Sequence, residues 1–357
     1  MKAMIMAAGV GSRLMPLTRQ IPKPMAPVGN MPLMENILYL LQKHECSEII
    51  ANLHYRPDVI RSYFGDGRAF NVSLHYSPED KLLGTAGGVK KCAWFLKDTF
   101  VIISGDVLTD VNLSYLLAAH KEKGALATIA LKEVTNVEQY GIVVTDEKDR
   151  ITDFQEKPKP SQALSNVANT GIYIFEPEIF DYIPQGQVYD FGKQLFPYLV
   201  KRKAPFFGVK ITDYWCDIGS IATYRQANID WLEGLVKTAV SPKDAIQGDN
   251  GSKVLMGDGV IRGKNVEISG KVVIGPGCRL GDNVLIKDSV IWSGTTIGNS
   301  VRVHEAVVGS NCNIAPHSEI GSNSAIGCQC QIPADQKIPP GSRLYTNGEG
   351  KLTELKE

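Results

Sequence analysis

A six-residue repeat in the last third of the chain restricts the fold more than any other feature of the sequence. From Val254 to Val290 a valine or cysteine recurs at every sixth position, and a second, mostly apolar residue follows two positions later, with Arg262 as the exception. After slips of one residue the step resumes at Cys312 and continues to Cys330. This is the hexapeptide pattern of a parallel β-helix. The repeat therefore predicts a left-handed parallel β-helix over residues 253–345.

The first 235 residues show a different pattern of apolar residues. Apolar runs typical of strands, such as 2–6 and 100–103, alternate with segments of helical periodicity such as 32–43. The alternation predicts an α/β domain with a doubly wound mixed sheet, which includes one hairpin around a solvated turn at 146–149. The predicted order is an α/β domain (1–235), a linker (236–252), the β-helix (253–345) and a C-terminal tail (346–357).

Composition restricts the partners and the compartment. Lysine plus arginine and aspartate plus glutamate both number 38, so no global basic field attracts nucleic acid or an anionic membrane. No stretch approaches the roughly 20 apolar residues of a membrane-spanning helix, and the N-terminus shows no leader pattern. The seven cysteines are scattered, which indicates reduced thiols and a cytoplasmic protein. We interpret Cys328 and Cys330 as packing residues, because no second pair accompanies them.

A glycine-rich segment directly follows the first predicted strand. Gly9 and Gly11 allow a phosphate to approach the backbone closely, and Arg13 and Lys23 add cations for phosphate oxygens. A dinucleotide-binding fingerprint would require a third glycine where the chain has Leu14, and the Gly-Lys-Ser/Thr of a Walker loop is absent. From the glycines alone, a tight strand-to-helix turn with two exposed cations remains the simpler alternative.

The complete string is more specific than its glycines. Residues 9–24 follow the pattern Gly-x-Gly-x-Arg-Leu-x-Pro-Leu-Thr-x-x-x-Pro-Lys-Pro, and Pro27, Val28, Pro32 and Glu35 continue it. This string closely resembles the signature of the sugar-1-phosphate nucleotidyltransferases, also called nucleotide-sugar pyrophosphorylases. The resemblance implies a reaction of a nucleoside triphosphate with a sugar 1-phosphate that yields a nucleotide sugar and pyrophosphate.

The resemblance also implies the residues that bind the nucleotide and the metal. It assigns nucleotide binding to Ala8, Gly9, Gly11, Ser12, Arg13, Gly84 and Thr85. It gives catalytic roles to Arg13, Lys23, Asp106 and Asp217, the two aspartates as Mg²⁺ ligands. By position alone Asp106 could instead cap a turn, and Asp217 could cap a helix predicted from Ser220 to Leu235. We expect Asp110 to be a helix cap rather than a ligand.

A third group of residues is implied for the sugar phosphate. It comprises Gly141, Glu156, Lys157, Asn169 and Thr170, of which Glu156 and Lys157 belong to a Glu-Lys-Pro element and Asn169 and Thr170 to an Asn-Thr-Gly strand. Without the upstream signature, a charged pair before a proline would indicate only a solvated edge. The Asp190–Phe196 segment resembles a helix of the family that we expect to be structural.

The substrates follow less directly from the sequence. Residues 84–90, with the β-helix, look most like mannose-1-phosphate guanylyltransferases, which implies GTP and mannose 1-phosphate as substrates. Relatives that use glucose 1-phosphate or a heptose phosphate share these motifs, and a catalytically silent regulatory subunit is a further alternative. An acyltransferase on the β-helix would require His304 or His317 as a base, and we expect both to be exposed loop residues. We therefore expect the β-helix to be structural and to form a homo-oligomer.

Overall fold

The computed structural model describes residues 1–238, 246–247 and 251–355. The chain divides into two compact units: unit 1 contains residues 1–9 and 37–215, and unit 2 contains residues 10–36 and 216–357. The segment with Arg13 and Lys23 thus belongs to the same unit as the β-helix. The sequence-based domain boundaries stay a prediction, and most of the predicted linker lies outside the described residues. In the part of the chain that the structure describes, every helix is too short or too polar to cross a bilayer.

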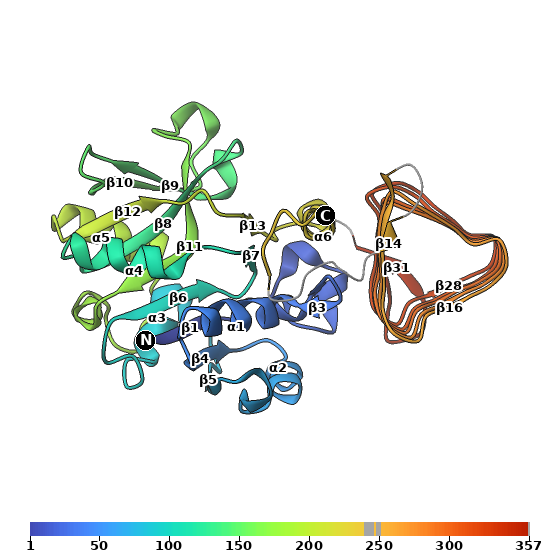
Figure 1. The fold of residues 1–357 in the computed structure, drawn as a ribbon, viewed down its shortest axis with the longest axis horizontal. Helices are drawn as coiled ribbons and strands as arrows, with labels where there is room; N and C mark the ends of the chain where they lie inside the picture. The colour runs from blue at the N-terminus through green and yellow to red at the C-terminus, as the bar shows by residue number, and fades with distance from the viewer. Residues whose placement is uncertain (239–245, 248–250, 356–357) are drawn as a thin grey trace. The chain divides into compact units, whose positions relative to one another are not determined.

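Unit 1 is built on a nine-stranded mixed sheet, as predicted. The strand order is β10-β9-β11-β6-β1-β4-β5, with β8 beside β11 and β12 beside β8. The central strand β1 pairs in parallel with β4 and β6, and β11 runs antiparallel to β6 (Figure 1). The strands are β1 (Lys2–Met6), β4 (Glu48–Leu53), β5 (Ser73–Pro78), β6 (Phe100–Ser104), β8 (Ala127–Glu133), β9 (Gly141–Thr145), β10 (Ile151–Glu156), β11 (Val167–Phe175) and β12 (Phe206–Lys210).

Helices and short strands complete the α/β part of the chain. The α-helices are α1 (Leu33–Lys43), α2 (Pro57–Phe64), α3 (Gly84–Lys91), α4 (Leu113–Glu122), α5 (Phe196–Lys201) and α6 (Ile221–Glu233). The short helices are η1 (Ser12–Leu14), η2 (Leu17–Arg19), η3 (Lys23–Met25), η4 (Arg68–Phe70), η5 (Val137–Gln139), η6 (Pro160–Gln162), η7 (Pro177–Tyr182) and η8 (Phe191–Leu195). The short strands are β2 (Pro27–Val28), β3 (Met31–Pro32), β7 (Val107–Thr109) and β13 (Trp215–Asp217).

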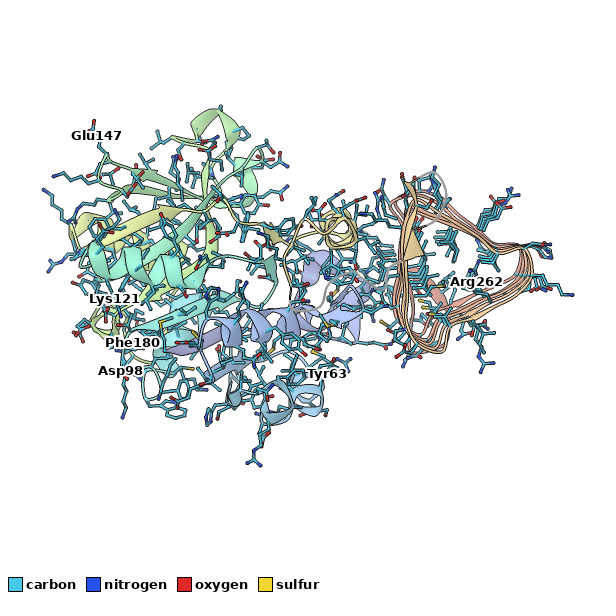
Figure 2. All side chains as sticks on the ribbon, in the orientation of Figure 1. Tyr63, Asp98, Lys121, Glu147, Phe180 and Arg262 are labelled. Atoms are coloured by element: carbon cyan, nitrogen blue, oxygen red, sulfur yellow. The ribbon has the colours of Figure 1, made fainter. Side chains whose placement is uncertain are left out.

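The core of unit 1 is rich in aromatic side chains. Phe191 stacks on Phe196 with ring centroids 5.4 Å apart, and Phe175 meets Phe191 edge-on. Burial of these rings supports the expectation that the segment from Asp190 is structural. The hairpin turn between β9 and β10 is exposed as predicted, with Glu147 pointing into solvent (Figure 2).

One helix start differs from the sequence interpretation, and a second decides between two alternatives. The side chain of Asn112, not Asp110, caps α4 by accepting a hydrogen bond from Tyr115 N. Asp110 instead accepts from Tyr214 N at 2.7 Å, so the prediction that it caps a helix was wrong. At α6 the cap is Ser220, in a reciprocal capping box with Thr223, so Asp217 does not have that role.

The described part of unit 2 from residue 246 forms the predicted β-helix, a stack of three-sided coils (Figure 1). One sheet contains β14 (Ile246–Gln247), β15 (Lys253–Met256), β18 (Lys271–Ile274), β21 (Val290–Ile291), β24 (Val307–Val308), β27 (Ala325–Ile326), β30 (Arg343–Thr346) and β31 (Leu352–Glu354). The second contains β16 (Ile261–Arg262), β19 (Arg279–Leu280), β22 (Thr296–Ile297), β25 (Asn313–Ile314) and β28 (Gln331–Ile332). The third contains β17 (Glu267–Ser269), β20 (Leu285–Lys287), β23 (Arg302–His304), β26 (Glu319–Ile320) and β29 (Lys337–Ile338).

The register of the coils moves the first slip of the repeat. Val254 pairs with Val272, three six-residue steps later, whereas Val273 pairs with Val290, one residue short of three steps. Val290 is therefore out of register with Val272, and the prediction that the six-residue step continues to Val290 was wrong. Small polar residues occupy several inward positions where the sequence has no valine. Ser318 and Ser324 are fully buried, and their hydroxyls donate to Pro333 O at 2.8 Å and Pro339 O at 2.9 Å. Each buried hydroxyl is therefore satisfied by the backbone of the following coil, which removes most of the cost of its burial.

A buried histidine makes the stability of unit 1 depend on pH. His120 lies between Thr128 and Glu176, with ring nitrogens 2.8 Å from Thr128 Oγ1 and 3.1 Å from Glu176 Oε1. Burial lowers the pKa of His120 below its usual 6.5, although the Glu176 charge opposes this shift. Below about pH 6.5 the unfolded chain therefore binds a proton that the folded chain resists, so the unfolding free energy decreases as the pH falls.

We expect His120→Gln to reduce this pH dependence. The measurement is urea unfolding at pH 7.5 and pH 5.5 for the wild type and the variant. An equal loss of unfolding free energy between the two pH values in both proteins would exclude His120 as the source.

Candidate active site

The glycine-rich segment is held in shape by contacts within unit 2. Gly11 has φ of 69°, and a Cβ added there would lie 2.9 Å from Lys23 Cβ. The Thr18 hydroxyl donates to Gly11 O at 2.8 Å, which closes the turn. Gly11 is therefore required by both its backbone conformation and the close approach of Lys23. Gly9 has an ordinary φ and open space around it, so of the two glycines only Gly11 is left-handed.

Arg13, Lys23 and Asp217 meet in unit 2, and we call them the cation–acid triad. Arg13 Nη2 lies 3.8 Å from Asp217 Oδ2, and Lys23 Nζ lies 3.6 Å from Asp217 Oδ1. The Lys23 side chain is only 8% exposed and that of Asp217 18%, whereas Arg13 is 54% exposed. Two cations share one carboxylate, so the triad keeps a net positive charge. Its most exposed member is a planar fork of donors suited to phosphate oxygens.

Gly219 leaves room for the Arg13 guanidinium next to the Asp217 carboxylate. A Cβ added at Gly219 would lie 2.9 Å from Arg13 Nη1. Ser12 begins η1 and is exposed, as is expected of a residue that contacts a ligand. The structure thus brings together three of the four predicted catalytic residues: Arg13, Lys23 and Asp217.

Sequence reasoning missed a buried polar network at the carboxyl end of β1. Asn52 accepts a hydrogen bond from Ala7 N at 2.9 Å and donates to Glu79 Oε1 at 2.7 Å, and Glu79 Oε2 accepts from Leu83 N at 3.0 Å. The network links the strand that leads to Ala8 with the start of α3. No motif marks either residue, because Asn52 looks in the sequence like an ordinary polar residue near the end of a strand and Glu79 like one just after a strand.

The predicted base-binding residues begin α3. Gly84 has φ of +75°, and a Cβ there would lie 2.7 Å from Tyr189 O. The Thr85 hydroxyl faces Asp190 Oδ1 at 3.3 Å and accepts from Phe191 N at 2.8 Å. These contacts hold the helix start against the segment before η8. The structure gives Thr85 a structural partner, and its contact with the nucleotide stays a prediction.

Asp106 lies just beyond the carboxyl end of β6, where ligands bind in open α/β sheets. The Ser104 hydroxyl donates to Asp106 Oδ1 at 2.8 Å and so orients the carboxylate. Gly171 has φ of +77°, and a Cβ there would lie 3.0 Å from Ser104 Cβ. Burial raises the pKa of Tyr173, and the negative charges of Glu156 and Asp106 raise it further. The charges of Asp106 and Glu156 therefore both reach the Tyr173 hydroxyl in unit 1.

The predicted sugar-phosphate residues differ in what their side chains and backbone contact. Asn169 donates from Nδ2 to Tyr173 OH at 3.1 Å and accepts from Gly171 N at 3.0 Å. Thr170 is buried, and its hydroxyl donates to Ala130 O at 2.7 Å within the sheet. Lys157 is a non-glycine residue with φ of 48°, and its backbone N donates to Tyr140 O. Of these three residues, only Thr170 uses its side chain in a hydrogen bond to the backbone of a neighbouring strand of the sheet.

Two glycines define the position of Glu156. It lies opposite Gly141 in the β9–β10 ladder, and a Cβ at Gly141 would lie 3.2 Å from its Oε2. A Cβ at Gly192 would lie 2.2 Å from the same oxygen. Burial raises the pKa of Glu156, and Asp190 adds to this shift while Lys157 and Lys193 oppose it. The carboxyl group is thus packed tightly against the backbone.

We expect Gly192→Ala to weaken binding of the sugar phosphate. The added methyl group would displace the Glu156 carboxylate, and misplacement by about 1 Å costs on the order of 10²-fold in a catalytic site. The KM for sugar 1-phosphate should rise roughly ten-fold or more, with a smaller change in the KM for the nucleotide. Gly348→Ala is the control, because a Cβ there has open space and an ordinary φ. An unchanged sugar-phosphate KM in Gly192→Ala would contradict the role of Glu156.

The residues present fit a magnesium ion by the chemistry of their donor atoms. Asp106 belongs to unit 1 and Asp217 to unit 2. Each offers carboxylate oxygens, the hard ligands that Mg²⁺ takes from proteins one or two at a time, together with substrate phosphates and water. Ser104 orients Asp106, and Arg13 and Lys23 of the triad pair with the Asp217 carboxylate.

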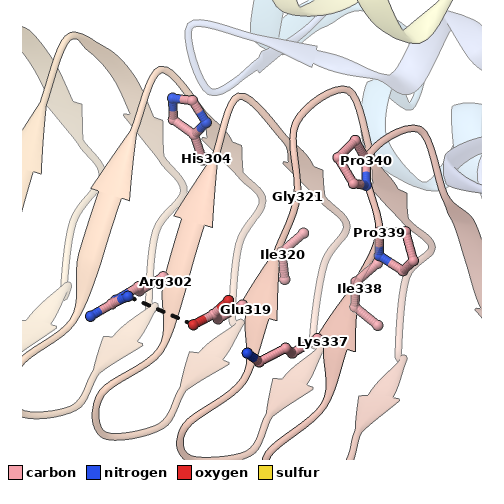
Figure 3. A pocket seen from close by; sticks show the side chains of 9 residues that line it. All are labelled: Arg302, His304, Glu319, Ile320, Gly321, Lys337, Ile338, Pro339 and Pro340. Carbon is pink, nitrogen blue, oxygen red and sulfur yellow. Dashed lines mark ion pairs between the residues drawn. The ribbon is translucent and has the colours of Figure 1, made fainter.

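His304 lies on an open groove across the third sheet of the β-helix. The groove has a volume of about 420 Å³, and Arg302 and Glu319 form an ion pair of 3.7 Å across it (Figure 3). His304 is exposed, as expected, but it ends strand β23 rather than lying in a loop. His317 is an exposed residue between strands with φ of 61°.

Comparison with known families identifies the class that this architecture defines. The family model for nucleotidyl transferases matches residues 2–234, and that for the GMPPB C-terminal domain matches residues 251–340. The first match spans the mixed sheet and the triad, and the second spans most of the β-helix. The chain belongs to the sugar-1-phosphate nucleotidyltransferase family.

Individual relatives resemble the chain over most of its length. A UTP–glucose-1-phosphate uridylyltransferase from Synechocystis is 41% identical and covers 92% of this chain and 88% of its own. A mannose-1-phosphate guanylyltransferase from Mycobacterium tuberculosis is 31% identical over 83% of this chain and 80% of its own. A solved structure from Bacillus anthracis, a candidate glucose-1-phosphate thymidylyltransferase, is 26% identical with a TM-score of 0.57 and covers 64% of this chain and 94% of its own.

Proposed function

We propose that the chain joins GTP and mannose 1-phosphate to give GDP-mannose and pyrophosphate. The cation–acid triad, together with the left-handed Gly11, supports the binding of a nucleoside triphosphate. The match of residues 251–340 to the GMPPB C-terminal domain, together with the mannose-1-phosphate guanylyltransferase relative, supports the sugar half. A second substrate pair, UTP with glucose 1-phosphate, is favoured by the relative with 41% identity.

The proposed chemistry requires positioning rather than a protein nucleophile. An oxygen of the sugar phosphate, which is already anionic, attacks the α-phosphorus of the triphosphate. The bond from that phosphorus to the bridging oxygen breaks, and pyrophosphate leaves with the electron pair. No proton has to be removed, so the difficulty is to bring two polyanions together in line.

Each site residue then has a defined task. Arg13 holds the β- and γ-phosphates and stabilises the departing pyrophosphate. Lys23 neutralises charge near the α-phosphate, and Lys157 holds the incoming sugar phosphate. Glu156 and Asn169 orient the sugar hydroxyls, and the start of α3 at Gly84 lies against the base.

We propose Asp106 and Asp217 as the ligands of Mg²⁺. The ion, when bound with the triphosphate, would supply a Lewis acid for the α-phosphate. The part of this chain is to present two carboxylates and to hold each in orientation. Ser104 does this for Asp106, and Arg13 and Lys23 do it for Asp217.

A substrate matrix tests the proposal. Four nucleoside triphosphates are combined with mannose, glucose and heptose 1-phosphates, and pyrophosphate release is measured for each pair. We expect the highest kcat/KM for GTP with mannose 1-phosphate. A maximum at UTP with glucose 1-phosphate would replace the first pair by the second, and no release with any pair would indicate a catalytically silent subunit.

Location and assembly belong to the same proposal. All seven cysteines are free thiols, which supports a reducing, cytoplasmic compartment. We propose that the β-helix mediates a homo-oligomer, which sedimentation of the full chain would test. Turnover of acetyl-CoA is the corresponding test for an acyltransferase at His304.

A further inference from the structure

The last coils of the β-helix lie directly against the segment that carries Arg13. A Cβ added at the buried Gly327 would lie 3.2 Å from both Cβ and O of Pro16. Cys328 Sγ lies 3.9 Å from Leu17 O. The Arg19 guanidinium lies 3.8 Å from the centre of the Tyr345 ring, a cation–π contact. Residues 16–19 are thus packed on the corner after β27 and on β30.

The other end of the same segment is anchored to different coils. Asn30 Nδ2 donates to Ile274 O at 3.0 Å, on β18. Gly29 N donates to Asn228 Oδ1 on α6 at 3.1 Å. Tyr224 of α6 donates to Pro27 O and accepts from Trp292 Nε1 at 2.8 Å. Residues 27–30 therefore reach the β-helix both directly and through α6.

The triad residues lie next to these two anchors. Arg13 lies three residues before Pro16, and Lys23 lies between Arg19 and Pro27. Between the anchors the segment is made of short helical turns, which define its geometry less well than a long element would. A cation that must meet a phosphate with sub-ångström accuracy requires such support.

We infer that the β-helix positions the nucleotide-binding segment, with Gly327 and Tyr345 as positioning residues that act through Pro16 and Arg19. This inference rests on the proposed function for its kinetic test. It predicts that the last coils contribute to nucleotide binding without touching the nucleotide. Tyr345 supplies the face of a ring, so the phenol hydroxyl is dispensable for this purpose.

The test compares Tyr345→Ala with the conservative variant Tyr345→Phe. We expect Tyr345→Ala to lower kcat/KM for the nucleoside triphosphate about ten-fold, within the effect expected of a displaced cation, and to leave the KM for sugar 1-phosphate unchanged. Tyr345→Phe should behave like the wild type. Arg19→Ala should reproduce the effect of Tyr345→Ala. Arg61→Ala is the matched control, because Arg61 also lies over a tyrosine ring, that of Tyr76 at 5.8 Å, but in unit 1.

A second readout is independent of activity. Trypsin cleaves after Arg13 and Arg19, so a loosened segment is cut faster. We expect Tyr345→Ala to accelerate cleavage at these sites at an unchanged Tm, and Tyr345→Phe to leave it at the wild-type rate. Wild-type kinetics and proteolysis in Tyr345→Ala would overturn the inference, as would losses of activity that only follow a lowered Tm. Failure of the wild type to turn over any substrate pair would refute the proposed function, while proteolysis would still decide the positioning role.

Discussion

Arg13→Ala is expected to lower kcat by roughly 10²–10³, the usual cost of removing one preorganised charge from an electrostatic site. Arg13 is the most exposed member of the triad, and Gly219 leaves room for its guanidinium beside Asp217. Charge builds up on the departing pyrophosphate in the transition state, so the loss should be larger in kcat than in KM. Pyrophosphate release at saturating substrates measures it.

Two further variants make this result specific. Arg13→Lys retains the charge but loses the planar fork, so its kcat should lie between those of the wild type and Arg13→Ala. Arg68→Ala is the control, because Arg68 is exposed in unit 1 and pairs only locally with Asp66 at 3.0 Å. Near-normal turnover of Arg13→Ala would remove Arg13 from the proposed mechanism.

Asp106→Asn should cause a loss of similar size, about 10²–10³ in kcat. The amide has nearly the same shape and can still accept the hydrogen bond from Ser104, so folding should be preserved. It has no negative charge with which to bind a divalent cation. The rate should therefore also depend differently on magnesium concentration, with a higher concentration needed for half-maximal activity.

Asp110→Asn is the matched control for this variant. Asp110 is a neighbouring aspartate whose carboxylate accepts a hydrogen bond from Tyr214 N, and asparagine can keep that bond. Its magnesium dependence should equal that of the wild type. The same shift in magnesium dependence for both variants would mean that general charge, rather than ligation by Asp106, is responsible.

The parts of the fold that were predicted correctly follow from patterns of apolar residues that repeat over short stretches of the sequence. The β-helix follows from a six-residue step because each step is one side of a coil, although the pairing of Val273 with Val290 places the first slip earlier than the spacing of the valines indicates. The mixed sheet follows from buried runs such as that of β1. These patterns are visible in sequence because neighbouring residues share one environment.

The parts that were missed depend on contacts between distant segments. Asn52 and Glu79 are separated by 27 residues, and no local signal shows that they share a hydrogen bond. Asp110 and Asn112 are equally good caps by composition, but Asp110 accepts a hydrogen bond from the distant Tyr214 while Asn112 caps α4. For the site, the motif gave Arg13, Lys23 and Asp217 as residues, but only the structure brings them around one carboxylate.

The packing of residues 16–19 on Gly327 and Tyr345 has a consequence for biosynthesis. A ribosome makes the nucleotide-binding segment well before the coils that support it. The strands of unit 1 can pair while translation continues, but the early segment waits for more than 300 residues before its partner exists. Nascent chains stalled before the coils that contain Gly327 and Tyr345 should consequently carry an unsupported Arg13.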